Sequence, residues 1–398
     1  MDITKPSKGL PVKGFKYRIY VNQAQADHLT KLFGCCRYVY NNLLGKVQAA
    51  YSDFKAKATT TKPVISANTL SAMLTELKRT PDHIWLNEVS SVALQQTTKH
   101  LDQAYQTFFK LKKGFPRFKS KRNKQSATFT TSGFSIEGDM LKIARLDQPI
   151  KLKLSRPLPS APTSCTISRN QAGQYHISFI CQYQPQRSNG TGVIGIDAGI
   201  TDLVTMSDGT YIPNPRHYVK TQRKLAKAQR KASRAKKGSN NRVKANLRVA
   251  RIHNRIANQR QDFLHKLSTR LVSENQAIAI ESLSIANMVK NSKLAKHILD
   301  AAWGKLREQL MYKVCETASA VLFLADPYYP STQLCHDCGR KPTTKIKLGV
   351  TKWTCEYCGA VHQRDNNAAK NLAKLAYSHM RFLKPGNHIV LTQRYQPV

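Results

Sequence analysis

The sequence predicts a multidomain α/β protein with a metal-binding insertion in its second half. Three observations lead to this prediction. In the first half, segments with helical periodicity interrupt a set of strand-like segments. In the second half, continuously apolar runs, such as GVIGIDAGI at 192–200 and QAIAIESL at 276–283, are typical of buried strands. Two Cys-x-x-Cys pairs within 331–361 are typical of a small metal-stabilised unit.

The first half is predicted to run from strand to helices and back to strands. Residues 13–22 alternate as a strand with one basic face does. Apolar residues then recur at helical spacing over 23–44, and a Thr-rich stretch at 57–62 indicates a loop. Turn residues separate short alternating runs over 127–184, including IKLKL at 150–154, which favours a small β-barrel or sandwich. Two further helices are expected at Asn68–Lys78 and Val89–Leu111, the second with Asn87 as its N-cap.

The pattern changes near Thr191 to alternating strands and helices. The run 202–212 is expected to pair with 192–200 as a hairpin, with Asp208–Gly209 at the turn. A break at Gly238–Asn240 divides the following Lys- and Arg-rich segment into two helices. The remaining expected elements are a strand at 276–283, a helix at 303–318, a strand at 320–329, the cysteine unit at 331–361, a helix at 364–377 and a mobile tail at 379–398.

The composition indicates a globular protein that binds a polyanion. Hydrophobic residues make up 41% of the 398 residues, and 64 Lys plus Arg against 23 Asp plus Glu give a net charge of +41. Such a charge repels itself in a compact chain, so nucleic acid is the expected partner, because neutralised phosphates release counterions. An anionic membrane is the alternative, but the sequence shows no basic amphipathic anchor and no apolar run of membrane-spanning length.

The N-terminal residues and the cysteines favour a cytoplasmic location. Residues 1–10 lack the apolar core of a signal peptide. The cysteines number nine, and an odd count with this clustering argues against a secreted disulfide framework. Five cysteines outside the pairs are expected to behave as small buried hydrophobes: Cys35, Cys36, Cys165, Cys181 and Cys315.

The motif formed by Cys335, Cys338, Cys355 and Cys358 predicts a zinc site. Sixteen residues separate the two pairs, and a glycine follows each pair, as suits a tight turn. Four thiolates close a tetrahedral shell around one zinc ion and leave no open position for catalysis. The spacing disfavours the alternative of reduced, unliganded cysteines. We expect one structural Zn²⁺, whose binding supplies much of the folding energy of this largely polar unit.

Three acidic residues occupy positions suited to metal-dependent chemistry. Asp197 and Glu281 each directly follow an apolar run, at the expected carboxyl edge of a sheet. Asp365 begins the final helix, where a carboxylate is also an ordinary N-terminal charge. One such acid alone is weak evidence of a site. Together the three supply hard oxygen ligands with which two Mg²⁺ or Mn²⁺ ions can hydrolyse a phosphodiester.

The segments GIDAGITDLVT, IAIESL, YYPSTQLCHDCG, TCEYCG and HQRDNNAAKNL resemble the RuvC nuclease domain of TnpB (OrfB) proteins of insertion sequences, relatives of type V CRISPR effectors. KYRIYVNQAQADHLTKLFGCCRYVYNNLL, WLNEVSSVALQQTTKHLDQAYQTFF and GFPRFKSKR extend the resemblance to nearly the whole chain. It implies an RNase H-like nuclease domain with an inserted zinc ribbon, preceded by a β-barrel wedge that a helical recognition insert interrupts. The implied layout is a wedge at 1–22 and 124–190, a recognition insert at 23–123, a nuclease domain at 191–330 and 362–378, a ribbon at 331–361 and a tail at 379–398.

The resemblance also implies an activity, the RNA-guided cutting of double-stranded DNA. A guide RNA from the element's own end would pair with target DNA beside a short transposon-adjacent motif. The family's catalytic acids correspond to Asp197, Glu281 and Asp365, whereas Gln363 stands where the family usually has Asp. We expect a monomer with its RNA, in the nucleoid of a prokaryotic cytoplasm.

Basic segments are expected to contact this nucleic acid. Residues 209–261 contain 16 Lys or Arg and no Asp or Glu, so phosphates would relieve their repulsion; a solvated face is the alternative. Phe115 and Phe118 could stack on bases or pack in the core. In the family, the helix of Gln95 faces the DNA motif, and Gln can read an adenine edge. The expected contacts are Ser91, Gln95, Arg117, Lys119, Lys121, Arg122, Arg223, Lys224, Arg230, Lys231, Arg234, Lys237, Arg242, Arg248, Arg251 and Arg255.

Three other functions remain open at this stage. A RuvC-like nuclease or transposase accessory protein that works without a guide would lack a defined co-purifying RNA. An RNA-guided repressor that binds without cutting usually has lost an active-site acid, whereas all three are present here. A basic zinc-ribbon DNA-binding protein leaves the three carboxylates unexplained.

Overall fold

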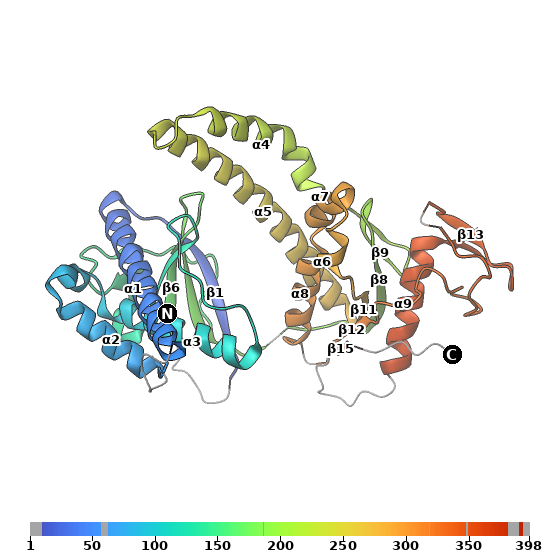
Figure 1. Ribbon diagram of the computed structural model, residues 1–398. Helices are drawn as coiled ribbons and strands as arrows, with labels where there is room; N and C mark the ends of the chain where they lie inside the picture. The colour runs from blue at the N-terminus through green and yellow to red at the C-terminus, as the bar shows by residue number, and fades with distance from the viewer. Residues whose placement is uncertain are drawn as a thin grey trace. The chain divides into compact units, whose positions relative to one another are not determined.

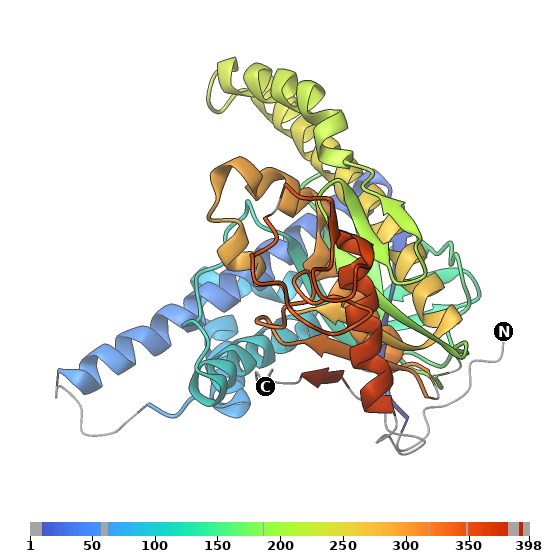
Figure 2. The ribbon, with the colours of Figure 1, turned by 90° about the vertical axis from the view of Figure 1, so that its right-hand side faces the viewer.

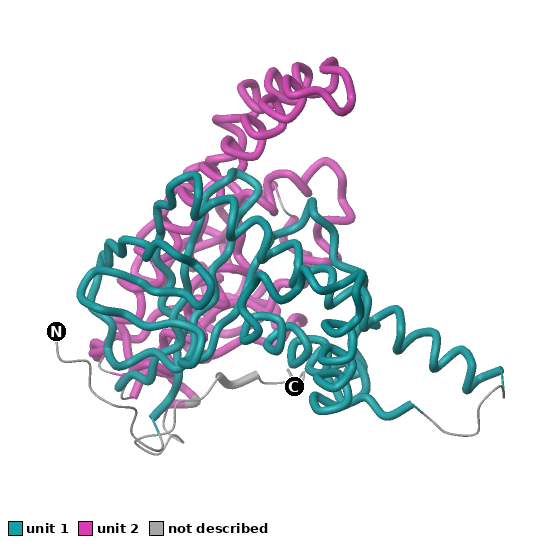
Figure 3. The backbone as a smooth tube through the Cα atoms, turned by 90° about the vertical axis from the view of Figure 1, so that its left-hand side faces the viewer, with its two compact units in different colours: residues 1–184 teal, residues 185–398 magenta. Residues whose placement is uncertain are grey.

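The computed structural model describes residues 10–56, 63–185, 187–317, 319–347, 349–380 and 390–392. The chain divides into two compact units, Met1–Gln184 and Pro185–Val398 (Figure 3). The loop predicted at 57–62 lies outside the described residues. Over the described ranges, none of the helices combines the length and the apolar character needed to cross a bilayer.

Unit 1 contains two antiparallel sheets, with the strand orders β1-β7-β6-β2 and β3-β4-β5. Buried and part-buried residues alternate along β7, which explains why this segment forms a strand with one face on the core. Phe15 of β1 pairs with Phe179 of β7 across the larger sheet. The strands are β1 (Val12–Ile19), β2 (Gln125–Thr130), β3 (Phe134–Glu137), β4 (Met140–Ile143), β5 (Ile150–Lys151), β6 (Ser164–Arg169) and β7 (Tyr175–Gln182).

Helices inserted between β1 and β2 share the core of these sheets. Asn22 caps the first of them through a capping box with Gln25, and Ser66 does the same for the second. The first helix continues past Leu44, where its predicted periodicity ended. These inserted helices are α1 (Gln23–Lys55), α2 (Ala67–Arg79), η1 (Pro81–Glu88) and α3 (Ser91–Leu111), and a short 3-10 helix, η2 (Thr131–Gly133), follows β2.

Four details of the prediction are wrong. The Asp208–Gly209 turn does not join 192–198 to 202–206, because it lies between 202–206 and a further strand at 211–213. Asn87 does not cap α3, because it lies in the separate 3-10 helix η1 and its Nδ2 donates to the Lys78 carbonyl at 3.3 Å. Only Ile150–Lys151 of the expected strand IKLKL pairs with a neighbour. Cys315 is exposed, whereas the other four cysteines outside the pairs are buried.

Unit 2 is built on a mixed six-stranded sheet with the order β10-β9-β8-β11-β12-β15. The first three strands in this order are antiparallel neighbours, and β8, β11, β12 and β15 run parallel. The carboxyl ends of β8 and β11 therefore lie at one edge. The strands are β8 (Gly192–Ala198), β9 (Asp202–Met206), β10 (Tyr211–Pro213), β11 (Asn275–Glu281), β12 (Val321–Ala325) and β15 (Val390–Thr392).

Helices cover both faces of this sheet, which confirms the α/β prediction. Ile278 and Leu322 point to one face, where they pack with the end of α5 (Asn240–Glu274) and with α8 (Trp303–Val314). Ala277 and Phe323 point to the other face, beneath α9 (Arg364–Met380). The short helices α6 (Ile285–Met288) and α7 (Ser292–Ala301) precede α8.

Between β10 and β11 the chain forms a long helical hairpin of α4 (His217–Arg234) and α5, visible in Figure 1. The break predicted at Gly238–Asn240 separates the two helices, and Ser239 caps α5. A small cluster of buried residues joins them: Leu225, Ala228, Ile252 and Ile256.

The cysteine unit lies beside α9 (Figure 1, Figure 2) and contains β13 (Lys352–Thr354) paired with β14 (Val361–Gln363). β14 leads directly into α9. Most of the tail expected to be mobile lies outside the described residues. Its described residues are 379–380, at the end of α9, and Val390–Thr392, which pairs with β12 as a parallel edge strand.

Candidate active site and metal centre

The two strand-end acids are neighbours at the carboxyl edge of the sheet. Ile196 of β8 and Ile280 of β11 are in register, so Asp197 and Glu281 follow at equivalent positions on adjacent parallel strands. Because Ile196 and Ile280 face the α8 side of the sheet, alternation turns both acids toward the face that α9 covers. Asp197 is only 7% exposed.

Asp365, in the first turn of α9, lies near Asp197 and Glu281. Arg364 holds this carboxylate through its Nε at 3.0 Å and its Nη2 at 2.9 Å, both to Oδ1. Gln363, which departs from the family pattern, accepts a hydrogen bond from the Asn366 backbone N–H at 2.7 Å and so stabilises the start of the helix. Asn366 Nδ2 in turn donates to the Met206 carbonyl of β9.

The three carboxylates influence one another electrostatically. Burial raises the pKa of Asp197 well above its ordinary value, and Glu281 and Asp365 raise it further, against an opposing effect of Arg364. Burial likewise raises the pKa of Glu281; the Ser331 hydrogen bond opposes this rise, whereas Asp365 adds to it. A cluster that disfavours its own ionisation is suited to binding cations, which relieve the repulsion.

The acids are more widely spread than the ligands of a single-ion shell. In the part of the chain that the structure describes, two groups of metal-ligating side chains have all ligand atoms within 4.8 Å of one another, and the three carboxylates are not among them. Two ions about 4 Å apart need ligands distributed over a wider space than one ion does. The donor set, carboxylate oxygens alone, favours Mg²⁺ or Mn²⁺ over zinc.

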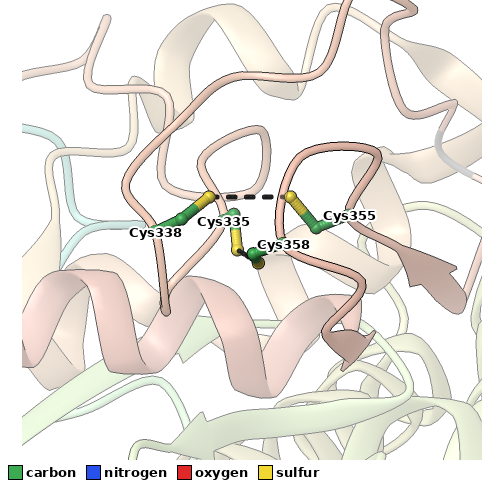
Figure 4. Close-up of side chains that lie close together, drawn as sticks. All are labelled: Cys335, Cys338, Cys355 and Cys358. Carbon is green, nitrogen blue, oxygen red and sulfur yellow. Dashed lines mark hydrogen bonds between the residues drawn. The ribbon is translucent and has the colours of Figure 1, made fainter.

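The four cysteines converge as the spacing predicted (Figure 4). Cys335 Sγ lies 3.6 Å from Cys358 Sγ, and Cys338 Sγ lies 3.6 Å from Cys355 Sγ. Zn–S bonds of about 2.3 Å in a tetrahedron put sulfurs roughly 3.8 Å apart. The cluster therefore fits one zinc ion.

His362 supports this cluster from β14. Its Nε2 lies 3.0 Å from Cys335 Sγ, and its ring packs on Trp353 with centroids 4.7 Å apart. Asp337, His362 and Cys335 form the second tight group of potential ligands, which shares Cys335 with the first. Because four cysteines already complete a tetrahedron, His362 is better placed as a hydrogen-bond donor to the Cys335 thiolate.

Of the ten residues of the helical hairpin that are predicted to contact nucleic acid, nine are exposed. Arg242 is the exception, because it is only partly exposed. Its Nη1 donates a hydrogen bond to the Ala235 carbonyl, just after the last residue of α4, at 2.8 Å. The exposed members are Arg223, Lys224, Arg230, Lys231, Arg234, Lys237, Arg248, Arg251 and Arg255.

A buried carboxylate from outside the basic block anchors the base of this hairpin. Asp300 of α7, with a side chain only 1% exposed, accepts hydrogen bonds from the backbone N–H groups of Tyr218 and Val219. It also pairs with Arg260 of α5 at 2.9 Å. One acid therefore satisfies the first turn of α4 and neutralises a cation of α5.

In unit 1 the other predicted contacts lie on the surface. Ser91 accepts a hydrogen bond from Lys78, and Gln95 is exposed one turn further along α3. Lys119 Nζ lies 3.8 Å from the centre of the Tyr40 ring. Phe115 packs edge-on against Phe108 but remains 44% exposed, so it is not a core residue. Phe118 is 56% exposed. Arg117, Lys121 and Arg122 are exposed as well.

Sequence reasoning missed the polar residues that support the acids. Ser331 is 3% exposed and donates to Glu281 Oε1 at 2.7 Å. Asn367 and Asn371, on one face of α9, bind the chain around Cys335. Their spacing of four residues within an alanine- and leucine-rich helix was the signal that could have marked them.

Comparison with protein families matches three parts of the chain. A model described as "Probable transposase" (OrfB_IS605) covers residues 176–292, and a "Cas12f1-like, TNB domain" covers 303–372. A third, the "Helix-turn-helix domain" of OrfB_IS605, covers residues 12–55. These residues form a strand and one continuous 33-residue helix here.

Two bacterial relatives match nearly the whole chain. A protein of Streptomyces pristinaespiralis, named "Putative RNA-guided DNA endonuclease", is 46% identical over 90% of this chain and 88% of its own length. InsQ of Escherichia coli K12, with the same description, is 30% identical over 91% of both chains.

Among solved structures, the fold resembles a Cas12f1 protein in a cryo-EM complex with sgRNA and target DNA. The TM-score is 0.51 at 11% identity, over 92% of this chain and 99% of the other. Fold and site together define an RNase H-like α/β protein with an inserted four-cysteine ribbon. The chain belongs to the TnpB (OrfB) family.

Proposed function

We propose that this protein is an RNA-guided endonuclease that cuts double-stranded DNA, with Asp197, Glu281 and Asp365 as its metal-binding residues. The observation that carries the proposal is the placement of Asp197 and Glu281 at equivalent ends of adjacent parallel strands, near Asp365, where burial and then repulsion from the other two acids raise the pKa of Asp197. The names of the relatives agree with it. A binding protein would gain nothing from burying such a cluster, which costs stability.

The carboxylates would hold two Mg²⁺ or Mn²⁺ ions, which supply activation of water and stabilisation of the leaving 3′-oxygen. Arg364 already neutralises part of the charge at Asp365, and Ser331 orients the Glu281 carboxylate. The single zinc ion would be structural, because its four thiolates complete the shell.

The exposed cations of the hairpin and of residues 117–122 would bind phosphates of guide RNA and target DNA without reading sequence. Ser91 and Gln95 would face the transposon-adjacent motif. The domain layout follows the family, and the protein would act as a monomer with its RNA in the prokaryotic cytoplasm.

The test is cleavage of a guide-matched duplex by Asp197→Ala, with Asp262→Ala, an exposed acid on α5, as the matched control. We expect Asp197→Ala to bind guide RNA and target normally but to cut at least about 1,000-fold more slowly, because it loses several kcal/mol of metal-derived stabilisation. Near wild-type cleavage by Asp197→Ala would refute the assignment. Cleavage that does not depend on a co-purifying RNA would favour the unguided nuclease instead.

A further inference from the structure

The loop that enters the zinc ribbon is bonded directly to one of the three acids. Ser331 lies four residues before Cys335, and its hydroxyl donates to Glu281 Oε1 at 2.7 Å. The side chain is almost completely buried, so the carboxylate oxygen receives this hydrogen bond without competition from water. The position of the loop therefore influences the orientation of Glu281.

Helix α9 binds the same loop through hydrogen bonds from two asparagine side chains. Asn371 Nδ2 donates to the carbonyls of Ser331 and Leu334, both at 2.8 Å. One turn earlier, Asn367 Nδ2 donates to the Leu334 carbonyl at 2.7 Å, and its Oδ1 accepts from the His336 N–H at 2.9 Å. These bonds hold the residues on both sides of the zinc ligand Cys335.

The helix that makes these bonds also carries Asp365. α9 packs so closely on β8 that a Cβ atom at Gly195 would lie 2.0 Å from the Ala369 carbonyl oxygen. The asparagine side chains are 2% and 4% exposed, so an unmade hydrogen bond there would leave a buried polar group unsatisfied. The cysteine loop, α9 and two of the acids consequently behave as one connected network.

We propose that Ser331, Asn367 and Asn371 are positioning residues that couple the zinc ribbon to the carboxylate site, so that zinc loading strengthens the binding of the divalent ions. This inference rests on the proposed function. Zinc fixes Cys335 and thereby the backbone groups of Leu334 and His336 that the asparagines bind. By linkage, the carboxylate ions and zinc must strengthen each other's binding by the same factor.

The test measures Mn²⁺ binding to the zinc-loaded full-length protein from the EPR signal of free Mn²⁺, with zinc content determined on the same samples. Ser331→Ala should retain one zinc ion and melt only about 2–4 °C lower, for one lost hydrogen bond of about 1 kcal/mol, but bind Mn²⁺ about 10-fold more weakly, as removal of an outer-shell partner does. Thr332→Ala, the adjacent hydroxyl residue, is the matched control and should bind Mn²⁺ within about twofold of wild type.

A second variant examines the coupling itself. Asn367→Ala should lose zinc faster to a competing chelator and should also bind Mn²⁺ more weakly. Unchanged Mn²⁺ affinity in both Ser331→Ala and Asn367→Ala would overturn the inference. Asp197→Ala separates the two proposals: if it binds Mn²⁺ as wild type does, the carboxylate site itself is wrong, whereas if it alone loses Mn²⁺, only the coupling is wrong.

Discussion

Gly195 offers a quantitative test of how tightly α9 must sit on the sheet. This residue lies in β8, two positions before Asp197, and faces α9. A Cβ atom added there would lie 2.0 Å from the Ala369 carbonyl oxygen and 2.4 Å from the Ala373 nitrogen, both backbone atoms. Real Cβ atoms essentially never approach closer than 3.0 Å. Gly195→Ala therefore forces α9, and Asp365 with it, away from Asp197 by about 1 Å, a displacement that can cost about 100-fold in rate.

The same displacement should lower stability. Overpacking of a well-packed core costs about 1–3 kcal/mol, and each kcal/mol lowers Tm by about 2–4 °C in a unit of this size. We expect Gly195→Ala to melt roughly 2–12 °C lower and to cut a guide-matched duplex about 100-fold more slowly, with guide RNA still bound.

The assays are thermal unfolding and single-turnover cleavage of the same protein preparation. Gly34→Ala in α1 is the control, because no atom lies within 4 Å of its added Cβ and alanine favours a helix by about 0.5–1 kcal/mol. If Gly195→Ala melted and cut like wild type, the close packing of α9 on β8 would not be what positions Asp365.

Three further outcomes are expected. Asp300→Ala should lower the free energy of unfolding by about 3–5 kcal/mol in urea titrations, because Arg260 and the first turn of α4 lose their buried partner; a loss below about 0.5 kcal/mol would contradict the anchoring role. Combined replacement of Arg248 and Arg255 by alanine should reduce the salt slope of RNA binding by about 0.7–0.9 per lost phosphate contact, and an unchanged slope would mean that these cations contact no phosphate. Because the pKa of Asp197 is raised in the folded protein, the free energy of unfolding without divalent ions should fall as pH rises from the ordinary carboxyl pKa to the raised one. Asp197→Asn should flatten this dependence and raise the free energy of unfolding at neutral pH by about 0.5–2 kcal/mol, measured by urea unfolding with zinc retained.

The sequence alone predicted those parts of the candidate site that depend on the spacing of residues within a segment. Two Cys-x-x-Cys pairs predicted a cluster that the structure forms, and the acids at the ends of apolar runs are indeed neighbours, because parallel strands bring their carboxyl ends to one edge. These signals need only the period of a strand or the geometry of a turn.

Contacts between distant segments could not be derived in this way. The bond from Ser331 to Glu281 joins residues 50 positions apart, and nothing in either local pattern indicates it. Asn87 had the residue type and position of an N-cap, but a proline at position 81 starts a separate short helix that includes it. Val390–Thr392 lacks a recognisable period because an edge strand of three residues is too short to show one.

The helical hairpin is long enough for its stiffness to depend on the length of the duplex bound beside it. α4 has 18 residues, which corresponds to about 27 Å of helix, or about eight base pairs of B-form duplex laid alongside it. One small buried cluster, Leu225, Ala228, Ile252 and Ile256, joins the two helices of this arm against the repulsion of its own cations. A duplex that spans the whole arm would neutralise this repulsion along its length, and a shorter one would leave the far end charged. The arm should therefore stiffen in proportion to the length of duplex that has formed beside it.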